Sequence, residues 1–213
     1  MPSRAQDGSE VDARTWDGRR LSYDDFLREA PADGRSREWV DGRVIELSPA
    51  SDRHQDLQGF LIALLRHWVE AKRCGVVRSQ PFQMKTGAHL AGREPDVLFL
   101  ASEHLDRLRE NHLAGPADLA VEIVSPDTRR HDTVEKLREY EEGGVREYWL
   151  IDHKPRRFEM RVLENDGRYR LMEPDADGVM RSRILEGLWL RSDWLWQKPL
   201  PPLLSILKEW KLV

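Results

Sequence analysis

LAVEIVSP, residues 119–126, has the pattern of a central β-strand that carries one charge. Apolar residues stand on both sides of Glu122, and the Ser-Pro pair then ends the extended run. A short run of this kind is typical of a strand whose two faces are both covered. An unpaired carboxylate in such a strand would cost several kcal/mol of desolvation free energy, so we expect Glu122 to have a compensating partner.

The elements around this strand predict an α/β fold. A helix is expected over 132–143, with Val134, Leu137 and Tyr140 facing inward, and a strand follows in REYWLID, residues 146–152. A strand, a helix and a strand within about 35 residues favour a parallel or mixed sheet. The other expected strands are residues 76–84 and 94–100, and an antiparallel hairpin made of 156–163 and 167–172.

The first third of the chain predicts a hairpin and two helices. Asp41-Gly42 separates two extended runs and is a strong signal for a two-residue turn. Ser22 is expected to cap a short helix over 23–28. Apolar residues recur at three- and four-residue spacing over 57–69, which predicts an amphipathic helix that packs on the core and stops near Gly75.

The length of 213 residues suits one domain. Residues 1–20 are polar and contain glycine, so we expect a flexible tail there and a single domain over 21–213. The Trp- and Leu-rich residues 185–213 are expected to close the core or to form a homodimer contact.

Composition narrows the classes of partner. A net charge of −4 argues against a protein that coats nucleic acid through bulk positive charge, although a local basic groove stays compatible. The sequence contains neither an apolar run near membrane-spanning length nor an apolar signal region, and Cys74 is the single cysteine. We therefore expect a cytoplasmic protein without a membrane partner.

Two acids predict a metal site. Asp96 stands at the head of one apolar strand and Glu122 stands inside the next, so adjacent strands would bring them together. Two carboxylates in a low-dielectric pocket repel each other unless a cation lies between them, and hard oxygen ligands favour Mg²⁺ or Mn²⁺ over zinc. The alternative is that Asp96 caps a turn and Glu122 pairs with a core Arg or Lys.

Lys136 follows Glu122 by fourteen positions, on the next helix. A βα connection returns that helix over the end of the strand, so the ammonium could reach the metal site and orient water or a phosphate. Arg129, Arg130 and Arg138 flank the same helix and are expected to bind nucleic-acid phosphates. The alternative for these charges is a solvated helix face.

These residues resemble a known family. The triplet EPD at 94–96 and VEIV at 121–124 are similar to the PD-(D/E)XK pattern of restriction-endonuclease-like nucleases. The longer stretches EWVDGRVIELSPASDRH, residues 38–54, and ADLAVEIVSPDTRRHDTVEKLREYEEGGVREYWLID, residues 117–152, resemble the Uma-two family of nucleases. The resemblance implies a restriction-endonuclease-like α/β fold, with a mixed central sheet flanked by helices.

The resemblance also assigns roles to single residues. Val124 stands where the general pattern has a strand lysine, and Lys136 matches the helix lysine that replaces it in the family. Glu38 matches a helper carboxylate and His54 a proton carrier at the mouth of the site, while the Ile123 carbonyl would complete the metal ligands. The alternatives are a cross-strand charge pair for Glu38 and a helix cap for His54.

The sequence therefore predicts a Mg²⁺- or Mn²⁺-dependent endonuclease that hydrolyses DNA. The two rival functions are a non-catalytic module that binds nucleic acid or protein around a structural ion network, and a hydrolase of another phosphoester. The sequence lacks a Gly-x-Ser-x-Gly elbow, a phosphate-binding Gly-rich loop and paired zinc-ligand spacings, which argues against those other chemistries.

Overall fold

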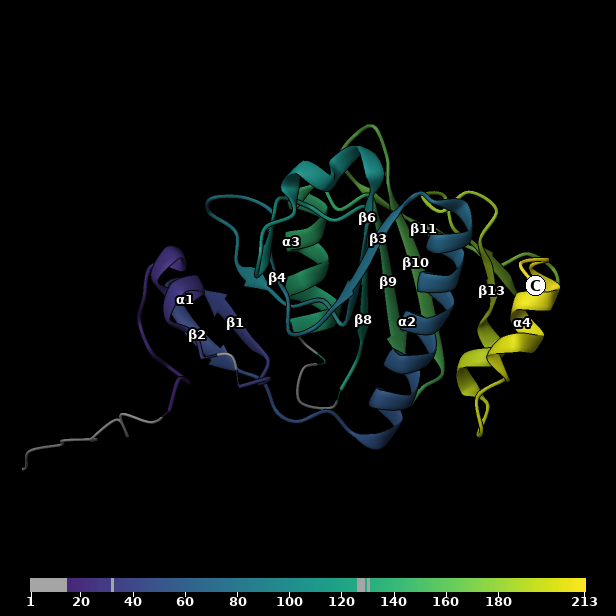
Figure 1. The fold of residues 1–213 in the computed structure, drawn as a ribbon, viewed down its shortest axis with the longest axis horizontal. Helices are drawn as coiled ribbons and strands as arrows, with labels where there is room; N and C mark the ends of the chain where they lie inside the picture. Colours follow the sequence, from purple (N-terminus) through teal and green to yellow (C-terminus); the bar gives the residue numbers. More distant parts are fainter. Residues whose placement is uncertain (1–14, 32, 126–128, 130) are drawn as a thin grey trace, which may run out of the picture.

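The computed structural model describes residues 15–31, 33–125, 129 and 131–213. In this part of the chain, a central six-stranded sheet has the order β11-β10-β9-β8-β6-β3 (Figure 1). Strands β8 and β9 pair in parallel and the other neighbours pair antiparallel. A second sheet has the order β2-β1-β5-β4-β7. The mixed sheet flanked by helices confirms the predicted fold class.

The elements have the following bounds. The central sheet contains β3 (Gly75–Ser79), β6 (Val97–Ala101), β8 (Leu119–Ile123), β9 (Glu147–Asp152), β10 (Arg157–Leu163) and β11 (Tyr169–Met172). The second sheet contains β1 (Arg37–Val40), β2 (Arg43–Glu46), β4 (Gln83–Lys85), β5 (Gly92–Arg93) and β7 (His112–Ala114), and β12 (Val179–Arg181) pairs with β13 (Trp189–Arg191). The helices are α1 (Tyr23–Glu29), α2 (Asp52–Lys72), η1 (Ser102–Arg107), η2 (His131–Glu135), α3 (Lys136–Gly143), η3 (Ser192–Trp196) and α4 (Leu203–Glu209).

The central strands bury both of their faces. Odd-numbered residues such as Val121 and Trp149 belong to the hydrophobic cluster that contains the inner face of α2. Even-numbered residues such as Ala120 and Tyr148 belong to the cluster that contains Tyr140 of α3. Because side chains alternate along a strand, Glu122 must point to the α3 side of the sheet.

The predicted hairpin and its neighbouring helices are confirmed. Asp41 and Gly42 have φ values of 49° and 79°, as the two-residue turn between β1 and β2 requires. The Ser22 side chain accepts a hydrogen bond from the backbone of Asp25 and caps α1. The pairing of β10 with β11 confirms the later hairpin. Helix α2 ends at Lys72 with Arg73 as its C-cap, slightly before the predicted stop near Gly75.

Two local predictions were wrong. The segment 76–84 is not one strand, because β3 and β4 belong to different sheets. Val134 is 58% exposed instead of facing inward. It lies in η2, a π-helical turn in which the 3.6-residue spacing that we used to assign its direction does not apply.

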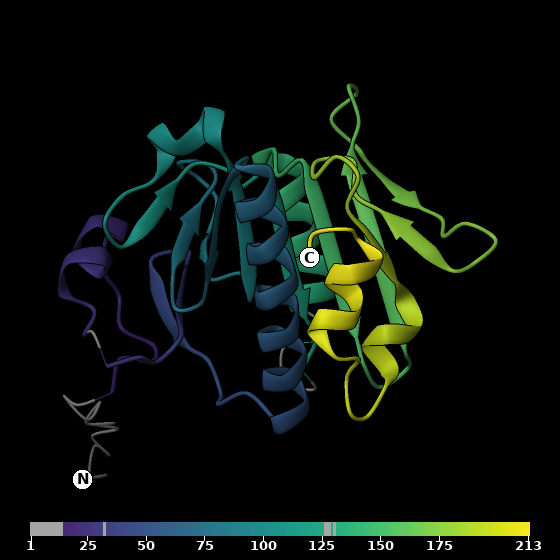
Figure 2. The ribbon, with the colours of Figure 1, turned by 45° about the vertical axis from the view of Figure 1, so that its right-hand side comes forward.

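The ends of the domain differ from one another. Residues 1–14 of the predicted tail lie outside the described residues, whereas Arg20 pairs with Arg43, so strand pairing starts before Leu21. At the other end, α4 lies beside α2 (Figure 2), and the rings of Trp68 and Trp210 meet at a centroid distance of 5.3 Å. The C-terminal segment thus closes the core, and the homodimer contact stays a prediction.

No helix among the described residues is long and apolar enough to cross a membrane.

Asp118 fixes the start of β8 and gives a test of the fold. Its buried carboxylate accepts hydrogen bonds from the backbone N–H of Ala101 at 2.7 Å, from His104 at 2.9 Å and from Arg146 at 3.1 Å. Burial opposes ionisation, but these donors outweigh it and lower the pKa of Asp118. We expect Asp118→Asn to lower the free energy of unfolding by about 2 kcal/mol at pH 7.

The pH dependence follows from the sign of this shift. A carboxyl with a lowered folded-state pKa stabilises the fold above the unfolded pKa of about 4, and this stability is lost as pH falls through the folded value. The difference between wild type and Asp118→Asn in urea unfolding should therefore shrink at acidic pH. Asp56→Asn, at an exposed position on α2, is the control, and an equal effect of both substitutions would contradict the prediction.

Candidate functional site

Glu122 faces α3 and has two partners there. Lys136 Nζ donates to its Oε2 at 2.9 Å, and the Tyr140 hydroxyl donates to its Oε1 at 2.7 Å. Lys136 and Tyr140 are four residues apart, so one face of α3 presents both groups to β8. The structure therefore brings Glu122 and Lys136 together, as the βα connection predicts. This contact is also what the alternative of a core Lys partner requires.

Three carboxylates surround the Lys136 ammonium. Its Nζ lies 2.9 Å from Glu122, 3.0 Å from Glu38 and 3.2 Å from Asp132, and the side chain is 4% exposed. Burial opposes the charged form, but the three carboxylates raise the pKa of Lys136 well above its usual value. Lys136 is therefore a fixed cation and a hydrogen-bond donor, and it cannot serve as a base near neutral pH.

Glu38 reaches this cluster from β1 of the second sheet. Its Oε2 accepts from Arg93 Nη1 at 2.6 Å, and Arg93 also forms a bidentate pair with Glu139 of α3 at 2.7 Å for each bond. Burial raises the pKa of Glu38, but Lys136 and Arg93 outweigh burial and lower it. Glu38 thus has a cross-strand partner, Arg93 on β5, and also contacts the Lys136 side of the site.

Asp96 links the ends of β6 and β8. Its Oδ2 accepts from the backbone N–H of Ile123 at 2.6 Å. His54 Nε2 and Gln80 Nε2 lie 2.9 Å and 2.7 Å from its Oδ1. The backbone N–H of His54 is itself capped by Ser51, so the side chain of His54 is not the helix cap that its alternative role supposed. Burial lowers the pKa of His54, but Asp96 outweighs burial and raises it.

The acids of the site shift the pKa of Glu122 through their charges. Burial raises the pKa of Glu122 well above its usual range, and Lys136 opposes that shift. The charges of Asp132, Asp96 and Glu38 raise it further, in that order. Asp96 and Glu122 are therefore brought into one electrostatic cluster, as expected from adjacent strands.

The residues present fit a hard divalent cation. Glu38, Asp96, Glu122 and Asp132 are all buried, and the buried Lys and Arg that contact these acids in the described part of the chain are Lys136 and Arg93. The oxygen donors of these buried carboxylates suit Mg²⁺ or Mn²⁺. A group of three or more His, Cys, Asp or Glu side chains arranged to hold an ion is absent from the described residues. A site here would therefore need the Ile123 carbonyl or water as further ligands.

Two of the three predicted phosphate-binding arginines are among the described residues. Arg129 forms an ion pair with the buried Asp152, with Nη2 to Oδ1 at 3.0 Å. Arg138 is exposed on α3, and Arg130 lies outside the described residues. Their role in binding nucleic acid stays a prediction.

The sequence interpretation missed Arg93, Gln80 and Glu94. Burial raises the pKa of Glu94 to about 7, and its carboxyl accepts from Gln83 Nε2 at 2.8 Å. The signal that was available is their position: Arg93 and Glu94 directly precede Pro95-Asp96, so they share the approach of the chain to the site.

Comparisons with known proteins show the family and the fold of the chain. Residues 23–193 match the Uma2 family model, which is described as "Putative restriction endonuclease". Among solved structures, the chain is similar to a "putative nuclease" from Anabaena variabilis ATCC 29413, with a TM-score of 0.66 and 19% sequence identity. The match covers 82% of this chain and 97% of that chain, and at this identity it supports the fold alone. No curated protein matches the chain.

Proposed function

Because the chain belongs to the Uma2 family of nucleases, we propose that it is a metal-dependent endonuclease that hydrolyses DNA phosphodiester bonds. The observation that carries the proposal is the contact of the buried Lys136 ammonium with Glu122 on β8. Asp96 lies beside this pair and accepts a hydrogen bond from the backbone N–H of Ile123, the next residue of β8. An amine and two acids at one sheet edge are the groups that hydrolysis of a phosphodiester needs.

Asp96, Glu122 and the Ile123 carbonyl would hold Mg²⁺ or Mn²⁺. When bound, such an ion supplies a water of lowered pKa and neutralises charge on the phosphate. His54 and Gln80 fix the Asp96 carboxylate through its Oδ1. Since His54 touches Asp96 and not the reacting atoms, we give it a positioning role.

Lys136 would orient the attacking water and stabilise negative charge on the phosphate. An ammonium has three N–H donors, and three carboxylate groups already lie within its reach. To donate to water or phosphate, Lys136 must therefore release one of these partners. Glu38 and Asp132 keep the ammonium charged and aimed at Glu122, which makes Glu38 a positioning residue as well.

Cleavage of supercoiled plasmid DNA tests the proposal. We expect relaxation of the plasmid with Mg²⁺ or Mn²⁺, none in excess chelator, and a loss of roughly a hundred-fold or more in Asp96→Asn, because the variant has one ligand charge fewer. In parallel, Mn²⁺ should raise the thermal midpoint of the wild type through binding to the folded state.

The thermal measurement separates the rivals. A protein that only binds nucleic acid should show neither cleavage nor stabilisation by Mn²⁺. A hydrolase of another phosphoester should be stabilised by Mn²⁺ and should cleave small phosphodiesters while leaving the plasmid intact. Either result would contradict the proposal.

A further inference from the structure

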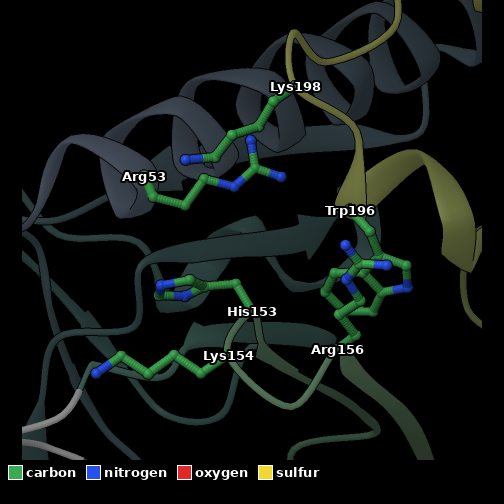
Figure 3. Close-up of a pocket in the computed structure, with 6 residues that line it drawn as sticks. All are labelled: Arg53, His153, Lys154, Arg156, Trp196 and Lys198. Atoms are coloured by element: carbon green, nitrogen blue, oxygen red, sulfur yellow. The ribbon is translucent and has the colours of Figure 1, made fainter.

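A basic pocket opens between the start of α2, the chain after β9 and the end of η3. Its volume is about 540 Å³, and it is lined by Arg53, His153, Lys154, Arg156, Trp196 and Lys198. Figure 3 shows Arg53 and Lys198 on one side of the opening, with His153 and Lys154 on the other. No carboxylate is among the described residues that line it. A concentration of basic side chains in a chain of net charge −4 points to an anionic ligand.

The pocket adjoins the candidate catalytic site. Arg53 directly precedes His54, whose ring Nε2 is hydrogen-bonded to Asp96 Oδ1 at 2.9 Å. His153 directly follows β9, and β9 pairs in parallel with β8, so the carboxyl ends of both strands lie at the same edge of the sheet. A DNA strand that places one phosphate near Asp96 would therefore pass close to this pocket.

Two buried nitrogen atoms in the pocket have no acceptor or donor among the described residues. Arg53 is 9% exposed, and its Nη2 donates to the Leu195 carbonyl at 2.6 Å while its Nη1 has no partner. His153 Nδ1 is buried and unpaired as well. Leaving a buried guanidinium N–H without an acceptor is costly, so Arg53 Nη1 is a donor that a ligand with oxygen atoms would satisfy.

We propose that this pocket binds one nucleotide of a single-stranded segment of the substrate, next to the phosphodiester that is cleaved. Arg53 and Lys198 bind its phosphate, because a guanidinium and an ammonium are the side chains that match phosphate oxygens. The half-buried indole of Trp196 stacks on its base. This inference rests on the proposed function and adds to it the path of the substrate strand.

Binding of a short fluorescein-labelled single-stranded DNA, measured by anisotropy in chelator, tests the inference without cleavage. We expect Arg53→Gln and the double variant Lys154→Gln/Lys198→Gln to weaken binding several-fold. The slope of log affinity against log salt should fall by about one for each phosphate that the variant no longer binds. Trp196→Ala should weaken binding roughly ten-fold with an unchanged slope. Arg66→Gln, exposed on the same helix, should bind as the wild type does.

The exposed lysines keep the test decisive if Arg53→Gln fails to fold. Wild-type binding by both the lysine double variant and Trp196→Ala would overturn the inference. Equally tight binding of a deoxynucleoside monophosphate would also overturn it, because the pocket would then recognise a small molecule instead of a strand. Pocket-dependent DNA binding by a wild type that cleaves nothing would support the pocket and contradict only the nuclease proposal.

Discussion

Glu122→Gln should abolish cleavage of plasmid DNA, with a loss of roughly a thousand-fold, while the protein stays folded. The substitution keeps the shape of the side chain but removes an oxygen ligand that a bound cation would hold in its charged form. We expect this to remove several kcal/mol of transition-state stabilisation. Lys136 retains Glu38 and Asp132 as partners, so we expect the free energy of unfolding to change by no more than about 1 kcal/mol.

Glu147→Gln is the matched control. Glu147 is also a buried glutamate in the central sheet, but it pairs in register with Leu119, at the opposite end of β8 from Ile123. Its carboxylate accepts from the backbone of Arg183 and from Trp149, away from Lys136. Cleavage should survive this substitution. A Glu122→Gln enzyme that cleaves at the wild-type rate would refute the role of Glu122, and initial rates of plasmid relaxation measure the difference.

Lys136→Met should give the largest loss of stability. Methionine has a similar length but no charge, and its introduction would leave the buried carboxylates of Glu38, Glu122 and Asp132 without their shared cation. Removing one partner of a buried ion pair typically costs 3–5 kcal/mol, so we expect a fall of roughly 10 °C in the thermal midpoint together with loss of cleavage.

A second substitution distinguishes this mechanism from a simple packing defect. Adding Glu122→Gln to Lys136→Met removes one of the uncompensated charges, so the double variant should recover part of the lost stability, on the order of 1 kcal/mol or more. If the two substitutions only add, the charge explanation is wrong. Lys208→Met, at an exposed position on α4, should leave the thermal midpoint nearly unchanged.

Local sequence patterns were sufficient for much of the fold. The Asp41-Gly42 turn, the apolar stripe of α2 and the β8-α3-β9 unit depend on residues near one another in the chain, where turn chemistry and periodicity decide the conformation. The contact of Lys136 with Glu122 follows from the same local logic, because a βα unit has little freedom in where it returns the helix.

Long-range partners could not be predicted in this way. Arg93 lies on β5, a strand of two residues, and its approach to Glu38 depends on the pairing of Trp39 with Gly92 across more than fifty positions. Arg53 and Trp196 are 143 positions apart and meet because α2 and the C-terminal segment share one core. No spacing rule connects such residues, since their proximity is a result of tertiary packing.

The position of Val124 has a consequence for control of the site. Where the general nuclease pattern has a strand lysine, this chain has a valine that is 1% exposed and packs in the same cluster as Tyr140. Asp96 and Glu122 therefore belong to the central sheet and its approach, whereas the amine is carried by a helix of eight residues preceded by a π-helical turn. If the proposed function is right, displacement of that one helix would remove the amine from the site while Asp96 and Glu122 kept their positions, and an inhibitor or a regulatory partner could act in this way.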